Sequence, residues 1–259
     1  LSAALLSDDA VTLSNFPTEL MDVKHKLSFV RRTGASADVE RDGNILTITG
    51  RGIGAGPQDR SHFDVPIRTT YLLAAAQLLR NGVARIPYPG GCPIGGGAGG
   101  GRGYDLHILV WESLGCQVCE REDHIEVRSK GLTGGLIDFP KSTVGGTENA
   151  LLCASIASGT TIVKNAYVTP EVQDLIDLLR AMGADITLEG SSLRIRGTAS
   201  PLAGAHFSVL PDRIEALTWL CFAAMTKGEV EIAGVPFGSM EIPLRHLQHA
   251  GIDYYKNSS

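Results

Sequence analysis

The fold is decided by the stretch Leu179-Arg-Ala-Met-Gly183-Ala-Asp-Ile186, in which an apolar helix pattern meets a glycine and then a short strand pattern. A glycine placed just beyond a helix adopts the left-handed backbone conformation that ends the helix. The same arrangement recurs around Gly115 and Gly251, so that these two glycines and Gly183 are spaced at intervals of 68 residues. A further copy surrounds Gly34. A constant interval is typical of a chain built from repeated structural units.

A second pattern alternates with the first: an apolar helix, a glycine and a strand, at Gly82, Gly159 and Gly228. Together the two patterns predict an α/β fold of roughly βαβαββ units, whose apolar helices should pack inward and whose sheets should face outward. The second unit is about ten residues longer than the others, and its additional residues run from Gly90 to Arg102. An insertion in one copy of a repeat often lies on the working face.

This inserted segment contains the first candidate site. Cys92 lies between Gly91 and Pro93, and Arg102 precedes an apolar helix pattern. A thiol and a guanidinium group beside the start of a helix suit an anionic substrate. The alternative interpretation rests on Gly95–Gly101, which contains six glycines and one alanine and has the composition of a linker.

Composition excludes several classes of function. The chain has 259 residues, a net charge of −5 and 43% hydrophobic residues, so we expect a globular protein that does not bind nucleic acid. No apolar run reaches membrane-spanning length. Cys116 and Cys119 form a Cys-x-x-Cys within a strand pattern, and no second pair completes a zinc site. We therefore expect a cytoplasmic enzyme without a metal.

Several stretches, distributed over essentially the whole chain, match one known family. They are Pro89-Gly-Gly-Cys-Pro-Ile-Gly95, Arg102 with Asp105-Leu-His107, Lys141-Ser-Thr-Val-Gly-Gly-Thr-Glu-Asn-Ala150, Gly159-Thr-Thr-Ile-Val-Lys-Asn-Ala166 with Pro170-Glu-Val-Gln-Asp-Leu175, and Val209-Leu-Pro-Asp-Arg-Ile-Glu-Ala216. By these motifs the chain resembles the enolpyruvyl transferases, and within that family the enzymes that act on UDP-N-acetylglucosamine.

The resemblance implies a two-domain fold. Each domain would contain three βαβαββ units packed with pseudo-threefold symmetry, as an inside-out α/β barrel. Residues 1–204 would form the first domain, with its first unit truncated, and residues 205–259 would form the first unit of an incomplete second domain.

The resemblance also implies a reaction. The enolpyruvyl (carboxyvinyl) group of phosphoenolpyruvate would move to a hydroxyl of UDP-N-acetylglucosamine with release of phosphate, a step of peptidoglycan biosynthesis. No metal and no organic cofactor would be needed. Phosphoenolpyruvate carries a phosphate and a carboxylate, and the planar guanidinium group of arginine matches such oxygens well.

Site residues follow from the same resemblance. Cys92 would act as general acid or as a transient covalent holder, Arg102 would bind the phosphate, and Arg68 would lie near the phosphate site. The residues that match the family's segments for the acceptor nucleotide are Lys141, Thr143, Val144 and Gly145 for the diphosphate and uracil, and Tyr104, Asp105 and Leu106 for the uracil pocket.

The chain departs from the family pattern in four respects. The family's lysine-asparagine pair would lie upstream of Leu1, and its catalytic aspartate and a late arginine would lie beyond Ser259, so we expect a fragment that is inactive by itself. Cys92 and Arg102 are ten residues apart, whereas the family has about five. Gly103-Tyr104 replaces the proline and small aliphatic residue that face the acceptor.

Two alternatives therefore stay open beside the nucleotide-sugar acceptor. One keeps the chemistry but uses a free uridine nucleotide such as UMP, as in nucleoside-antibiotic biosynthesis. The other is a nucleotide-binding fragment without catalysis. The shikimate-pathway relatives are disfavoured because they lack a cysteine loop of this type.

Overall fold

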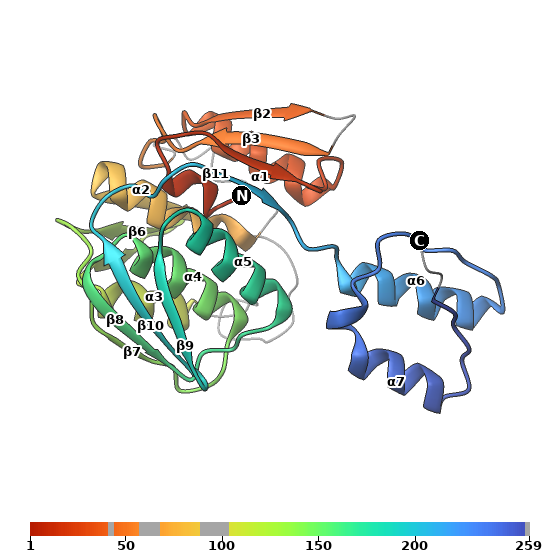
Figure 1. Cartoon of the computed structure of the whole chain (residues 1–259). Helices are drawn as coiled ribbons and strands as arrows, with labels where there is room; N and C mark the ends of the chain where they lie inside the picture. Colours follow the sequence, from red (N-terminus) through yellow and green to blue (C-terminus); the bar gives the residue numbers. More distant parts are fainter. Residues whose placement is uncertain (41–43, 57–67, 89–103, 257–259) are drawn as a thin grey trace. The chain divides into compact units, whose positions relative to one another are not determined.

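The computed structural model describes residues 1–40, 44–56, 68–88 and 104–256 (Figure 1). The chain forms two compact units, Leu1–Ser208 and Val209–Ser259. Each unit is described separately below.

The first sheet of the larger unit contains β1 (Val11–Ser14), β2 (Ser36–Glu40), β3 (Ile45–Thr49) and β11 (Ala205–Ser208), in the order β11-β1-β3-β2. The strand β11 is parallel to β1, and the other pairs are antiparallel. Helix α1 (Met21–Arg32) connects β1 to β2, and the short η1 (Ala4–Leu6) is buried beside the sheet.

The second sheet is antiparallel and has the order β4-β6-β5, with β4 (Val83–Pro87), β5 (Gln117–Glu120) and β6 (His124–Arg128). The apolar helix expected before Gly82 begins as a 3-10 helix, η3 (Arg68–Leu73), and continues as α2 (Ala74–Asn81). Gly82 ends α2 with φ +64°, as the glycine pattern predicts. Helix α3 (Asp105–Ser113) precedes β5.

The third sheet belongs to a complete βαβαββ unit. Its elements are β7 (Leu136–Asp138), α4 (Val144–Ser155), β8 (Ser158–Lys164), α5 (Pro170–Ala181), β9 (Asp185–Glu189) and β10 (Ser192–Thr198), and the strand order is β7-β8-β10-β9. Thr169 caps α5 by accepting a hydrogen bond from the Val172 backbone N–H, and Pro170 occupies the first turn. The repeat predicted from sequence is confirmed here.

The helices form the core of the larger compact unit, Leu1–Ser208. Helix α4 is buried along most of its length and contacts α2, α3 and α5. The strands alternate between buried and more exposed residues, as in β3 and β10, because one face of each sheet covers the helices. Figure 1 shows the sheets at the periphery of the unit.

The smaller unit contains α6 (Arg213–Thr226), η4 (Phe237–Ser239) and α7 (Glu241–His249). Its core consists of Ala216, Met240, Leu244 and Leu247. Helix α6 starts at Arg213, because the Asp212 carboxylate accepts hydrogen bonds from the Ile214 and Glu215 N–H groups at 2.7 and 3.2 Å.

Two sequence expectations are wrong in this smaller unit. The residues after Gly228 and after Gly251 were expected to form strands, but the structure assigns no strand to the part of residues 209–256 that it describes. A strand needs a neighbouring strand to satisfy its N–H and C=O groups, and this unit offers none within the described range. The division into domains at residues 204 and 205 stays a prediction, and β11 pairs with β1 inside the larger unit.

Candidate functional site

The start of helix α4 carries four of the expected acceptor-binding residues. Thr143 is its N-cap, and the hydroxyl accepts a hydrogen bond from the Gly146 N–H at 3.2 Å. Its carbonyl accepts one from the Thr147 hydroxyl at 2.6 Å. Lys141 is exposed just ahead of the helix. The first-turn N–H groups of Val144 and Gly145 have no carbonyl of a preceding turn to bond, so this end of the helix suits an anion.

The start of helix α3 carries the other three expected acceptor-binding residues. Tyr104 is the N-cap, Asp105 is exposed in the first turn, and Leu106 is half-buried. The Tyr104 carbonyl accepts a hydrogen bond from the His107 N–H at 2.8 Å. His107 is only 5% exposed, so the helix turns its imidazole toward the core.

Two aromatic rings bring these helix starts together. The ring of Tyr71, in η3, lies 3.8 Å from the ring of His107, centroid to centroid, at an interplanar angle of 32°. A methyl group added at Gly145 would lie 2.8 Å from the Tyr71 hydroxyl and 3.4 Å from His107 Cε1. The Tyr104 ring lies 6.4 Å from that of His107. η3 and the starts of α3 and α4 therefore meet at one place.

The residues expected to bind phosphate are only partly described. Arg68 is the first residue of η3, three residues before Tyr71, and its side chain lies outside the described part of the chain. Cys92, Arg102 and the Gly95–Gly101 tract also lie outside the described residues. The roles expected for Cys92 and Arg102 remain predictions.

The second turn of α4 brings a carboxyl group near a lysine. Burial lowers the pKa of Lys26, on α1, to about 8, and the neighbouring Glu148 carboxylate partly opposes this shift. Burial likewise raises the pKa of Glu148, and the Lys26 ammonium counteracts the rise. Glu171, in the first turn of α5, raises the Glu148 pKa further. Titratable groups from three helices thus influence one another.

Comparison with known proteins identifies the family. The sequence pattern of EPSP synthase (3-phosphoshikimate 1-carboxyvinyltransferase) matches residues 1–255. The chain belongs to the EPSP synthase family.

Curated relatives carry a more specific name within this family. The UDP-N-acetylglucosamine 1-carboxyvinyltransferase of Paracoccus denitrificans is 36% identical over 255 residues, which are 97% of this chain and 58% of the relative. The enzyme of the same name from Solidesulfovibrio magneticus is 38% identical over the same shares. The chain thus spans 58% of the length of these relatives.

Solved structures confirm the fold class. The enolpyruvyl transferase NikO from Streptomyces tendae superposes with a TM-score of 0.81 at 19% identity, over the whole of this chain and 60% of that one. EPSP synthase from Acinetobacter baumannii gives a TM-score of 0.63 at 19% identity, over 86% of this chain and 50% of that one. Within the described residues, no helix is both long and apolar enough to span a membrane.

Tyr71 and His107 of this family member join the candidate site, although the sequence does not mark them as candidates. Tyr71 occurs in a run that is apolar nearly all round, which is typical of core. His107 lies in the Asp105-Leu-His107 motif, and this motif is the sequence feature that could have marked His107 as a candidate. Neither pattern shows that the two rings stack beneath the start of α4, because they are 36 residues apart in the chain.

Replacing Thr143 with alanine is expected to lower the free energy of unfolding by about 1 kcal/mol, because the first turn of α4 loses its cap. Urea unfolding followed by circular dichroism would measure the change. Thr143→Ser keeps the hydroxyl and should stay close to the parent. Equal losses for both substitutions would show that the methyl group, not the cap, matters.

Replacing Gly145 with alanine is expected to lower the free energy of unfolding by about 1–3 kcal/mol, because the new methyl group meets the Tyr71 hydroxyl. Removing that hydroxyl should relieve the contact, because the next Tyr71 atom, Cζ, would be 3.7 Å from the methyl group. The loss caused by Gly145→Ala should therefore be smaller in a Tyr71→Phe background. A double-mutant cycle in urea measures this coupling, and identical losses in both backgrounds would contradict it.

Proposed function

We propose that this protein transfers the enolpyruvyl group of phosphoenolpyruvate to a hydroxyl of UDP-N-acetylglucosamine and releases phosphate. The observation that carries the proposal is the meeting of η3 with the starts of α3 and α4 through Tyr71, His107 and Gly145. Tyr71 lies three residues after Arg68, the residue expected near the phosphate, and Gly145 belongs to the segment expected to hold the acceptor, which supports a shared site for both substrates. The names of the curated relatives support the same acceptor.

The acceptor would be held by the two helix starts. The N–H groups of Val144 and Gly145 would donate to the diphosphate, and Lys141 would add a positive charge. The backbone of Tyr104, Asp105 and Leu106 would line the uracil pocket. The sugar hydroxyl would then be held toward phosphoenolpyruvate, whose phosphate would lie between Arg68 and Arg102.

The reaction would proceed by addition and elimination. Cys92 would protonate C3 of phosphoenolpyruvate while the acceptor oxygen attacks C2 and loses its proton to a base, which gives a tetrahedral phospho-ketal. Loss of a proton from C3 and departure of phosphate would restore the double bond. The two arginines would stabilise the charge that develops on the phosphate. We also propose that the protein acts in the cytoplasm, where both substrates would be available.

One observation favours a second acceptor. Tyr104 places an aromatic ring at the N-cap of α3, where the family has a small aliphatic residue, and this ring lies 6.0 Å from that of Tyr88. A larger side chain at the acceptor pocket would suit a smaller nucleotide. A free uridine nucleotide such as UMP is therefore the alternative acceptor for the same chemistry.

The test is phosphate release by the longest encoded form of the protein. Phosphoenolpyruvate would be supplied with UDP-N-acetylglucosamine, with UMP or with shikimate 3-phosphate, and phosphate would be followed continuously. Release with UDP-N-acetylglucosamine alone supports the proposal, and release with UMP alone replaces the acceptor. Nucleotide binding without release from any acceptor would overturn the enzyme assignment and leave a binding module.

A further inference from the structure

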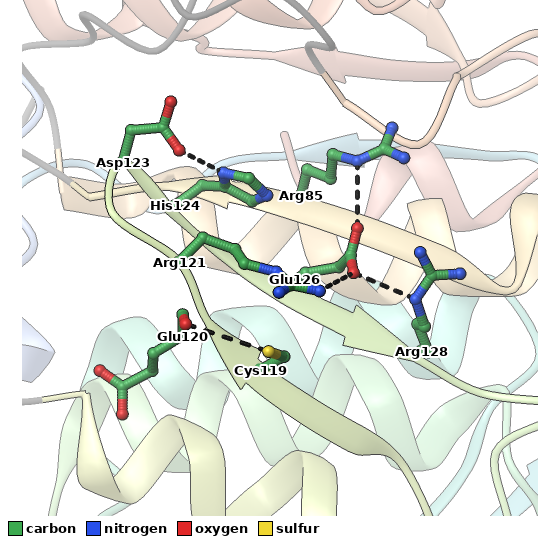
Figure 2. Close-up of polar contacts among 8 residues, drawn as sticks. All are labelled: Arg85, Cys119, Glu120, Arg121, Asp123, His124, Glu126 and Arg128. Atoms are coloured by element: carbon green, nitrogen blue, oxygen red, sulfur yellow. Dashed lines mark hydrogen bonds and ion pairs between the residues drawn. The ribbon is translucent and has the colours of Figure 1, made fainter.

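The outer face of the second sheet carries an uneven cluster of charges. Glu126, in the central strand β6, is paired in register with Arg85 of β4. Arg128 lies two residues further along β6 and so points to the same face. Arg121 follows β5 and reaches the same carboxylate, as Figure 2 shows. Three guanidinium groups from three segments thus surround one carboxylate.

The contacts use both carboxylate oxygens. Glu126 Oε2 accepts from Arg85 Nε at 3.3 Å, and Oε1 accepts from Arg121 Nη2 at 3.2 Å and from Arg128 Nε at 3.1 Å. The Glu126 side chain is only 8% exposed although it lies on the outer face. Hydrogen bonding, first from Arg128 and then from the other two arginines, lowers the Glu126 pKa to about 2. The carboxylate is therefore ionised and holds the three cations in place.

The cluster has more positive than negative charge. Three guanidinium groups and one carboxylate leave this set of four side chains with an excess of two positive charges, in a chain whose net charge is −5. The neighbouring acids interact elsewhere: Asp123 bonds the His124 imidazole at 2.6 Å, and Glu120 interacts with Tyr88. Glu122 is also exposed on the turn and has a partner of its own. None of these carboxylates is among the contacts of the three arginines in the described residues.

Donors remain available on the solvent side. Each of the three arginines donates a single N–H to Glu126, and a guanidinium group has five. The side chains of Arg121 and Arg128 are 52% and 55% exposed and converge on the same oxygen, Oε1. An ordinary cross-strand ion pair needs one arginine, as Arg194 and Glu189 show on the third sheet. The two additional cations leave a positive charge that one dianion would neutralise.

We propose that Arg85, Arg121 and Arg128 form a binding site for a small dianionic oxyanion, such as inorganic phosphate, with Glu126 as the internal anchor that positions the three guanidinium groups. This site lies on the outer face of β4-β6-β5. It is distinct from the proposed enolpyruvyl site at the starts of α3 and α4, and it does not depend on that function.

The experiment is a phosphate titration of the full chain at pH 7.5, followed by NMR of the arginine Nε–H groups. The Nε–H groups of Arg85 and Arg128 donate to Glu126, so both should give resolved signals, assigned through Arg→Lys variants. Ionic strength would be held constant with chloride. The backbone N–H signals of Val144 and Gly145 report separately on phosphate bound at the enolpyruvyl site.

We expect saturable shifts of both Nε–H signals, with a Kd of about 1 mM. Arg121→Ala should weaken this binding about tenfold, because the ligand loses one exposed cation. Arg194→Ala, which removes an equally exposed arginine from another sheet, should leave it unchanged. Linear shifts, equal shifts with chloride, or no effect of Arg121→Ala with the fold retained would overturn the proposal and leave a purely structural cluster.

Discussion

Replacing Cys92 with serine in the longest encoded form is expected to reduce phosphate release from phosphoenolpyruvate by about 100-fold or more. The reaction needs a proton at C3, and a serine hydroxyl is a far weaker acid than a thiol. A correctly positioned general acid contributes about 10²–10⁴-fold to rate. The measurement is the initial rate of phosphate release with the acceptor that gives the highest activity.

The matched control is Cys119→Ser. Cys119 is a free, exposed thiol in strand β5, outside the segments that match the family's site residues. This substitution should leave the rate within about twofold, as expected for a surface position. A loss below about tenfold for Cys92→Ser, with the control unchanged, would mean that another group protonates C3.

Replacing Gly50 with alanine is expected to lower the free energy of unfolding of the larger unit by about 3 kcal/mol or more. The added methyl group would overlap the backbone carbonyl of Leu5 and would lie 2.8 Å from Arg80 Nη2. Leu5 is fully buried in η1, and the Gly50 N–H donates to the Ser7 carbonyl at 2.9 Å, so neither backbone segment can move away cheaply. Urea unfolding with a core-sensitive probe would report the loss.

Gly54→Ala is the control for that experiment. Gly54 lies in the same connection, and among the described residues a methyl group there would meet the Thr33 carbonyl, at 3.2 Å. We expect this variant to lose less than about 1 kcal/mol. If the two variants were equally stable, the close approach of Gly50 to Leu5 would be refuted.

The sequence by itself determined the repeat, many of the element boundaries and the family. These follow from local signals: the glycine after a helix, as at Gly82 and Gly183, and the cap at Thr169-Pro170. Each of them acts within one turn of chain, so it can be read without knowing the fold. The candidate binding segments at Tyr104–Leu106 and Thr143–Gly145 were likewise recognisable as motifs.

Only the tertiary structure decided which residues meet. The stacking of Tyr71 on His107 and the fit of Gly145 against both join residues from three helices, and nothing in the local pattern of any one helix predicts it. The prediction of strands after Gly228 and Gly251 was wrong for the same reason. A strand depends on a neighbouring strand, and local sequence does not specify that partner. The three arginines around Glu126 also needed the register of β4 against β6. Local propensity is set by neighbours in sequence, whereas contact is set by how whole elements pack.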